Sequence, residues 1–290
     1  MPTTDPLDLG GIEVYPISGG KNLVDGGWVM GILPKKIWNR WYPADEENRI
    51  LLESHCLLVR TSDETLLIET GCGNKLDAKE QAFHGAFQDD WIEPNLRAAG
   101  FSPEEINRVV LTHMHTDHIG GALKAEEAGE FVPTFPNALV TVCKGEFEDA
   151  TNGRGITPVA YNNKNFEVLL DQGLLETVDP DARLSQHIRF VSTPGHTPSH
   201  QSVLIEGSVR TLLFAGDLLA MKCQATPHFN MAVDTAPVIK IATKRRILEE
   251  ALNKEWILML AHEPQSPFYS VSPQKEKARF RLEPLDSGLA

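Results

Sequence analysis

The chain contains the stretch His113-Met114-His115-Thr116-Asp117-His118, and the glycines of Ile119-Gly120-Gly121 follow it. Apolar and β-branched residues precede this stretch over 108–112, a pattern that predicts a short buried strand. Imidazole and carboxylate groups are the usual ligands of zinc and similar ions, so four of them within six residues indicate more than packing. The stretch therefore predicts a metal-binding loop at the end of a strand, where catalytic groups usually gather.

The composition restricts the class of protein. The 290 residues, 41% of them hydrophobic, are enough for one large globular domain or two small ones. No run approaches the ~18 apolar residues of a membrane span. The net charge of −13 disfavours a nucleic-acid partner, because phosphate binding needs a basic surface. We expect a small-molecule substrate, no nucleic acid and no membrane, and a homodimer stays open.

The cysteines and the N-terminus indicate a compartment. The four cysteines are scattered and include no C-x-x-C pair, which favours reduced thiols. The first ten residues hold two acids and no basic residue, unlike a signal peptide. We therefore expect a cytoplasmic protein.

The stretch 113–118 resembles the HxHxDH signature of the metallo-β-lactamase superfamily. Three later residues resemble the remaining ligands of that superfamily, in the same order: His196 in a Thr-Pro-Gly-His turn, Asp217 after a glycine, and His262. The resemblance spans at least residues 51–262. It implies an α/β protein with the αββα four-layer sandwich of the superfamily, as a single domain over 1–290.

The resemblance also implies how two divalent metal ions would be held. One ion would be bound by His113, His115 and His196, and the other by Asp117, His118 and His262, while Asp217 would bridge both. Asp117 would in addition orient the bridging hydroxide, which makes it the candidate catalytic residue. Zinc suits this mixed nitrogen and oxygen ligand set, although Fe, Mn or Co would also be tolerated.

Two further residues are expected near the ligands. The superfamily usually has Asp where this chain has Glu69, and that acid is expected to support the metal loop. Because Glu69 is one methylene longer, we expect the support to be shifted or lost. His200 follows His196 closely and is expected to form a hydrogen bond within its own loop.

Periodicity predicts the remaining elements. Strands are expected over 11–17 (at a sheet edge), 51–60, 65–69, 139–142, 188–192, 201–206, 210–215 and 255–261. Helices are expected over 88–100, after a capping box that begins at Ser102, and over 238–253. In the last of these, we expect Lys244 and Arg245 to lie outside the apolar face.

Two segments show no regular pattern. Residues 18–42 are rich in glycine and tryptophan, and we expect a loop that covers the metal site as a lid. Residues 270–290 are polar, and we expect a tail that wraps the body or is partly disordered. The candidate substrate-pocket residues are Trp28, Trp38, Tyr161 and His228.

The resemblance implies a dinuclear, metal-dependent hydrolase of a carboxylic ester that acts through a metal-bridging hydroxide. The residues outside the ligand motifs, at 34–38, 43–50 and 227–231, resemble the sequences of a bacterial group of hydrolases with this fold. Some members of that group are lactonases. We therefore favour a lactone of the N-acyl-homoserine type as substrate. Many such lactonases carry a tyrosine shortly after the bridging Asp, where this chain has Leu218-Leu219-Ala220. We expect that this hydroxyl is either missing here or replaced by a group from elsewhere, with Tyr161 and His228 as the candidates.

Other functions remain open. An arylesterase or organophosphate (phosphotriester) hydrolase is the alternative, because that branch shares the seven ligands and favours an aromatic-lined pocket. A glyoxalase II-like thioesterase ranks lower, since 275–279 only weakly resembles its basic C-terminal segment. A zinc β-lactamase ranks lower because that class lacks a bridging Asp, and a non-catalytic metal-binding protein ranks lower because an open dinuclear ligand set is typical of catalysis.

Overall fold

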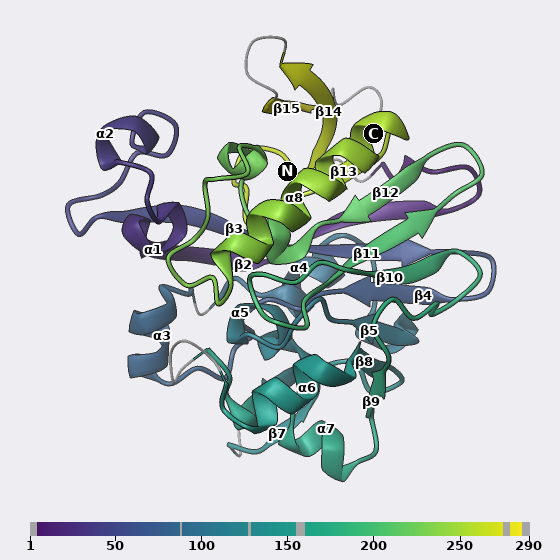
Figure 1. The fold of residues 1–290 in the computed structure, drawn as a ribbon. Coiled ribbons are helices and arrows are strands. Elements are labelled where there is room, and N and C mark those ends of the chain that lie inside the picture. Colours follow the sequence, from purple (N-terminus) through teal and green to yellow (C-terminus); the bar gives the residue numbers. More distant parts are fainter. Residues whose placement is uncertain (1–4, 88, 127–128, 155–159, 275–278, 286–290) are drawn as a thin grey trace.

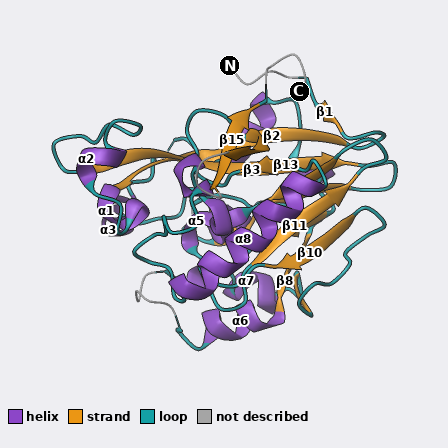
Figure 2. Ribbon diagram, turned by 45° about the horizontal axis from the view of Figure 1, so that its top comes forward, coloured by secondary structure: helices purple, strands orange, loops and turns teal. Residues whose placement is uncertain are grey.

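A computed structural model of the protein describes the chain apart from residues 1–4, 88, 127–128, 155–159, 275–278 and 286–290. Two β-sheets lie face to face at its centre, and helices pack on their outer faces (Figure 1; Figure 2 shows the same layers from another side). The order of the layers is the predicted αββα sandwich.

The first sheet has seven described strands in the order β1-β2-β3-β4-β5-β8-β9. Neighbours are antiparallel from β1 to β4 and parallel from β4 to β9. The strands are β1 (Leu7–Asp8), β2 (Glu13–Asp25), β3 (Arg49–Arg60), β4 (Thr65–Ile68), β5 (Arg108–Val110), β8 (Leu139–Cys143) and β9 (Leu175–Val178).

The second sheet has six described strands in the order β10 to β15, and only its β12–β13 pair is parallel. These strands are β10 (Ile188–Ser192), β11 (Gln201–Glu206), β12 (Thr211–Phe214), β13 (Ile257–Met259), β14 (Phe268–Gln274) and β15 (Arg279–Pro284). A separate small pair consists of β6 (Leu123–Ala125) and β7 (Phe131–Pro133).

The helices are short except the last. They are α1 (Gly26–Met30), α2 (Lys35–Trp38), α3 (Ala78–His84), α4 (Ile92–Ala98), α5 (Thr116–Ile119), α6 (Lys144–Thr151), α7 (Glu167–Asp171) and α8 (Pro237–Asn253). Single 3₁₀ turns cover η1 (Pro103–Glu105), η2 (Gly120–Ala122), η3 (Asn163–Asn165), η4 (Gly216–Leu219) and η5 (Lys222–Ala225).

Three apolar layers hold the sandwich together. Successive residues of a strand face opposite sides, so Leu66 and Ile68 of β4 pack between the two sheets while Leu67 packs under α4. On the far side, Ile247 and Leu248 of α8 pack on the second sheet. Both faces of each sheet are therefore buried, as the apolar runs of these strands predict.

The strands deliver the candidate ligands to one edge of the sandwich. The stretch 113–118 follows β5, and His196, Asp217 and His262 follow β10, β12 and β13. Within each sheet these strands run in the same direction, so their carboxyl ends meet at the same edge. The site is therefore built where parallel strands end.

The segments expected to lack regular structure, 18–42 and 270–290, contain strands and helices, although 18–42 does contribute Asn22, Val24, Trp28 and Val29 to the cavity described below. Residues 18–25 are the second half of β2, which pairs with β3 and continues past a bulge between Ser18 and Lys21. Beyond them lie α1 and α2 instead of a loop. The described part of the tail forms the hairpin of β14 and β15, which extends the second sheet, and its apolar side chains join the cluster that also holds Ile247 and Leu248 of α8. The bulge and the hairpin partner are long-range features that local composition does not reveal.

Smaller expectations also differ. Residues 13–17 do not form an edge strand, because β1 pairs outside β2. The capping box at Ser102 is present, but only the turn η1 follows it. The helix expected over 88–100 is the shorter α4, and residue 88 lies outside the described residues. Lys244 was expected off the apolar face of α8 and is instead fully buried.

Candidate metal centre and its cavity

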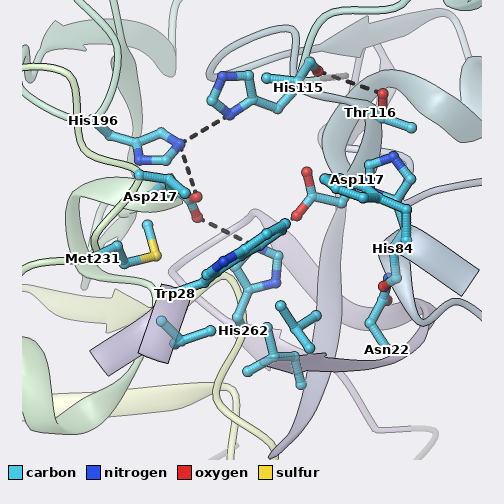
Figure 3. Close-up of a pocket in the computed structure, with 16 residues that line it drawn as sticks. Asn22, Trp28, His84, His115, Thr116, Asp117, His196, Asp217, Met231 and His262 are labelled. Carbon is cyan, nitrogen blue, oxygen red and sulfur yellow. Dashed lines mark hydrogen bonds and ion pairs between the residues drawn. The ribbon is translucent and has the colours of Figure 1, made fainter. Parts of the chain in front are cut away.

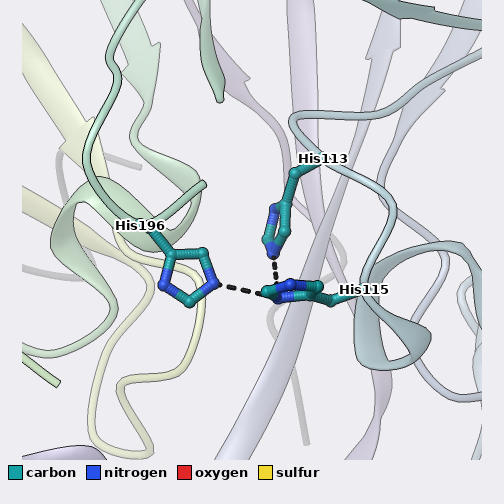
Figure 4. Close-up of side chains that lie close together, drawn as sticks. All are labelled: His113, His115 and His196. Atoms are coloured by element: carbon teal, nitrogen blue, oxygen red, sulfur yellow. Dashed lines mark hydrogen bonds between the residues drawn. The ribbon is translucent and has the colours of Figure 1, made fainter. Parts of the chain in front are cut away.

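Seven side chains present possible ligand atoms at the edge described above. His113, His115 and His196 form one group, and Asp117, His118 and His262 form another, with the ligand atoms of each group within 4.8 Å of one another. In the first group, His115 Nδ1 lies 3.1 Å from His113 Nε2 and 3.0 Å from His196 Nε2 (Figure 4). The structure thus brings together the two groups that the resemblance implied.

Asp217 lies between the two groups. Its Oδ2 is 3.1 Å from His196 Nε2, and its Oδ1 is 3.2 Å from His262 Nε2 and 3.6 Å from His118 Nε2 (Figure 3). The same Oδ1 is buried and has no hydrogen-bond partner among the described residues. Each oxygen of this carboxylate therefore faces a different group.

The chemistry of these donors fits two divalent cations. His196 Nδ1 donates to Asp234, and its Nε2 lies 3.0 Å from His115 Nδ1 and 3.1 Å from Asp217 Oδ2, so nitrogen and oxygen atoms of three side chains converge as ligands around a cation do. Burial lowers the pKa of His115 to about 3 and that of His113 well below its usual value, so both imidazoles are neutral. Neutral imidazoles and carboxylates are the form in which these residues bind metal.

The second group is richer in acid. Burial alone would lower the pKa of His118, but the carboxylates of Asp117, Glu69 and Asp217 raise it well above its usual value. So strong a demand for positive charge is what a divalent cation would satisfy. The donors present therefore fit two cations of the kind predicted.

Glu69 supports the metal loop despite its extra methylene. Its Oε1 accepts a hydrogen bond from Thr112 N at 2.7 Å, and its Oε2 accepts one from His118 Nδ1 at 3.0 Å. Glu69 itself has φ +66°, a conformation that is uncommon outside glycine. The expectation of a lost contact is wrong, because the backbone conformation of Glu69 places both oxygens in reach.

Asp234 supports His196 in the same way, and the sequence analysis missed it. Its Oδ1 accepts from His196 Nδ1 at 2.9 Å and from Lys240 Nζ at 2.6 Å. Burial alone would raise the pKa of Asp234, but the Lys240 ammonium and His196 hold it below its usual value. Asp234 and Lys240 lie in loop and helix positions with no motif, so nothing local indicates them.

Two more buried residues order the loops. His200 Nε2 accepts from Asp217 N at 3.0 Å while its Nδ1 donates to Thr193, so His200 does bond within the ligand loops as expected. Glu146, which the sequence analysis also missed, accepts from Thr197 Oγ1 at 2.6 Å and from Tyr161 Oη at 2.7 Å. Glu146 therefore joins the loop of His196 to the segment that carries Tyr161.

A cavity of about 120 Å³ opens onto these groups (Figure 3). Five of the seven candidate ligands line it: His115, Asp117, His196, Asp217 and His262. The side chains that we call the apolar wall surround them: Val24, Trp28, Val29, Leu52, Phe83, Ala160, Met231 and Val233. Three other polar residues complete the lining: Asn22, His84 and Thr116. A mostly apolar cleft with a few convergent polar groups is typical of a small-molecule site.

One of the four predicted pocket residues lines this cavity. Trp28 does so from α1, and its ring packs against Phe83 at 5.1 Å. Trp38 is buried instead and packs against Gly26. A Cβ added to Gly26 would lie 2.5 Å from the Trp38 indole. The Tyr161 hydroxyl donates to Glu146, and the exposed His228 accepts from Arg245 at 3.0 Å. Leu218, Leu219 and Ala220 are fully buried, so none of these residues replaces the absent tyrosine.

Known proteins resemble this chain over most of its length. A family model described as the metallo-beta-lactamase superfamily matches residues 49–262. An N-acyl homoserine lactonase of a Bacillus species is 26% identical over 162 residues, which cover 52% of this chain and 57% of that relative. The N-acyl homoserine lactonase of Bacillus thuringiensis is 24% identical over 270 residues, which cover 87% and 93%. The chain thus aligns with less than two thirds of the first relative and with most of the second.

Two solved structures share the fold of this chain. A probable metal-dependent hydrolase from Staphylococcus aureus superposes with a TM-score of 0.83 at 25% identity, over 95% of this chain and 98% of that one. AidC, a dizinc quorum-quenching lactonase in complex with a hexanoyl-homoserine product, superposes with a TM-score of 0.77 at 22% identity, over 97% of both chains. Within the described residues, no helix is long and apolar enough to cross a bilayer. Because the family model covers 49–262 and the sandwich agrees with it, the chain belongs to the metallo-beta-lactamase superfamily.

Proposed function

We propose that this protein is a metal-dependent hydrolase that opens the ester ring of N-acyl homoserine lactones. The observation that carries the proposal is the pair of ligand groups with Asp217 between them, at the base of a cavity with an apolar wall. The names of the relatives at 24% and 26% identity support the substrate class.

The residues that would hold the cations follow from the geometry. His113, His115 and His196 would bind the first, Asp117, His118 and His262 the second, and Asp217 would contribute one oxygen to each. When bound, two divalent cations supply Lewis acidity, which lowers the pKa of water to about 7 and polarises a carbonyl oxygen. We propose zinc, with Fe, Mn or Co as ions that the same donors accept.

Asp117 is the candidate for moving the proton. Burial alone would raise its pKa, but the imidazoles of His118 and His262 hold it below its usual value, so the group is a carboxylate at neutral pH. It lines the cavity, with Oδ2 3.6 Å from His262 Nε2. Water adds to the lactone carbonyl, the ring C–O bond breaks, and Asp117 carries the proton from the water to the departing alkoxide oxygen. The products are a carboxylic acid and an alcohol on one chain, and the acid releases its proton to the solvent at neutral pH.

The apolar wall would hold the acyl chain. Trp28 and Phe83 form one side of it, and Met231 and Val233 belong to another segment of the chain. Contact with these side chains removes apolar substrate surface from water without adding a charge, so it favours an acylated lactone over a short polar ester.

Metal content and substrate preference test the proposal together. Protein purified without chelator is analysed for metals, and its rates are compared on N-hexanoyl homoserine lactone, an aryl acetate and a phosphotriester. We expect about two metals per chain, as a dinuclear site requires, and the highest kcat/KM on the lactone. Two metals with turnover of only the aryl ester or the phosphotriester would contradict the lactonase assignment, and a folded protein that takes up no metal on reconstitution would contradict the metal centre.

A further inference from the structure

Three polar residues line the cavity without belonging to the ligand groups, and two of them are already committed. Asn22 donates through Nδ2 to Cys72 Sγ at 3.3 Å and to the His84 carbonyl at 3.1 Å, and its Oδ1 accepts from Ser54. Thr116 Oγ1 donates to the Ala160 carbonyl at 3.4 Å and accepts from Asn165. Neither side chain has a spare donor for a substrate.

His84 is the third of these residues, and its ring is uncommitted. It faces the cavity next to Asp117 (Figure 3), and neither ring nitrogen forms a hydrogen bond or ion pair within the described part of the chain. A neutral imidazole carries one N–H donor and one acceptor nitrogen. His84 is therefore the polar group outside the ligand groups that can bind a substrate atom directly.

The backbone around His84 is held rigidly at its place in the cavity. Gly85 follows it with φ +61°, and a Cβ there would lie 1.9 Å from the Leu23 carbonyl oxygen, so the end of α3 touches β2. Leu23 N donates to Gly85 O at 2.9 Å, and Asn22 Nδ2 donates to the His84 carbonyl. Because the backbone is fixed, only the two side-chain torsions of His84 need to be ordered when a ligand binds, which keeps the entropic cost small.

The position of His84 relates it to one part of the substrate. Its neighbour Phe83 belongs to the apolar wall, while His84 itself lies beside Asp117 of the ligand groups. In an N-acyl homoserine lactone, the ring goes to the ligand groups and the acyl chain to the apolar wall, so the amide between them falls next to His84. This argument rests on the proposed function.

We propose that the His84 imidazole donates a hydrogen bond to the amide carbonyl of the acyl group, which makes His84 a positioning and specificity-determining residue. The amide is the feature that distinguishes these lactones from simple alkyl lactones, so His84 selects for the acylamino substituent.

A cycle of variants and substrates tests the inference with the metal-loaded enzyme. His84→Phe keeps a ring and removes the hydrogen bond, His84→Gln keeps an N–H donor and removes the ring, and His84→Ala removes both. Each is assayed on N-hexanoyl homoserine lactone and on an α-alkyl-γ-butyrolactone of equal chain length without the amide. We expect the Phe and Ala variants to lose about tenfold in kcat/KM on the amide substrate, mainly through KM, with Gln restoring most of it. On the substrate without the amide, we expect all variants to stay within about twofold of the wild type.

Binding and metal content separate this role from a structural one. Calorimetric affinity for the ring-opened product N-hexanoyl homoserine should fall by the same factor in the Phe and Ala variants, with metal content unchanged. The matched histidine control is His187→Gln. His187 immediately precedes β10 and does not line the cavity, so this variant should behave as the wild type. Equal losses on both substrates, or no loss on either, would overturn the role of His84 while lactonase activity stands. A wild-type protein that binds metal and opens neither lactone would instead overturn the proposed function.

Discussion

The ligand groups and the apolar wall are held in place by different physics. His118, His196 and His262 are each buried and anchored through Nδ1, to Glu69, Asp234 and the Glu53 carbonyl. Trp28 and Phe83 are each 37% exposed, lie on short helices and meet through ring contact. Directional hydrogen bonds hold the imidazole rings in a narrow range of orientations. Apolar contacts are not directional, so the side chains of the apolar wall can rearrange with little loss of free energy. The comparison suggests that chemistry is set by the strand ends and substrate range by the short helices.

The largest effect is expected at Asp217, the residue shared by both ligand groups. Asp217→Ala removes the only carboxylate among the described residues whose two oxygens face both groups. We expect metal content to fall from about two to one or fewer per chain and kcat/KM to fall at least about a thousandfold. Elemental analysis and lactone hydrolysis measure both, with exposed Asp63→Ala as the matched control. Full two-metal stoichiometry in Asp217→Ala would contradict the bridging position.

An intermediate effect on metal affinity is expected at Glu69, which contacts a candidate ligand but is not one itself. Glu69→Asp shortens the side chain that joins His118 Nδ1 to Thr112 N, so one of the two hydrogen bonds is lost. Such partners typically change metal affinity or activity by about 10- to 100-fold. Competition with a chelating dye measures the affinity, and Glu64→Asp on the preceding turn is the control. Unchanged affinity would show that the ligand groups do not depend on this support.

A smaller and more selective effect is expected in the apolar wall. Trp28→Ala should leave metal content intact and raise KM for long acyl chains about tenfold, because roughly 1.4 kcal/mol of apolar contact is lost. Short acyl chains should be affected less, since they reach less of the wall. Kinetics across chain lengths from butanoyl to decanoyl measure the difference. If the kinetic constants of Trp28→Ala equal those of the wild type at every chain length, Trp28 does not contribute to binding of the acyl chain.

The smallest effect is on stability and depends on pH. Lys244 is buried on α8, where it donates to the Phe229 carbonyl at 2.7 Å behind the loop that leads to Met231. Burial lowers its pKa to about 6 from an ordinary value of 10.5, so between these values the unfolded chain holds one more proton than the folded one. The free energy of unfolding therefore rises with pH across this window, by about 1.4 kcal/mol per unit from this group, and the contribution is lost as the pH falls toward 6.

Lys244→Met should remove that slope. Urea unfolding at pH 7, 8 and 9 is expected to show the wild-type protein gaining stability relative to Lys244→Met at each step. Lys254→Met, at an exposed lysine beyond the same helix, is the matched control. Parallel pH profiles for the wild type and Lys244→Met would show that the buried lysine is charged in the folded state.

The elements predicted from local pattern agree best with the structure. The strands expected over 51–60 and 201–206 correspond to β3 and β11, and the helix over 238–253 corresponds to α8. Each of these has an apolar period that a few neighbouring residues define. The candidate ligands 113–118 and His196 were predicted for a similar reason, because the first stretch and the Thr-Pro-Gly-His turn are continuous motifs.

Residues that act through a distant partner were missed, or their contacts were predicted incorrectly. Glu146 touches Thr197, and Glu69 touches His118, across 51 and 49 positions of the chain. Lys244 was taken as a surface charge, but the carbonyls of the 224–229 loop meet its ammonium inside the protein. Tyr161 and His228 were chosen as pocket residues by residue type, and neither lines the cavity: the ring of Tyr161 packs on His115 at 4.9 Å while its hydroxyl bonds to Glu146, and His228 bonds to Arg245.

The amino-acid sequence alone settles which superfamily the chain resembles, which seven side chains are candidate ligands and in which strand-ending loops they lie. These features depend on local sequence, because a strand, the turn after it and the candidate ligand in that turn are formed by consecutive residues. Only the tertiary structure shows that Glu69 and Asp234 anchor the imidazoles and that Trp28 lines the cavity while Trp38 does not. It also places His84 in the cavity lining with no hydrogen bond of its ring to another residue in the part of the chain that the structure describes. The physical reason is that side chains far apart in the chain meet only after the sheets have packed.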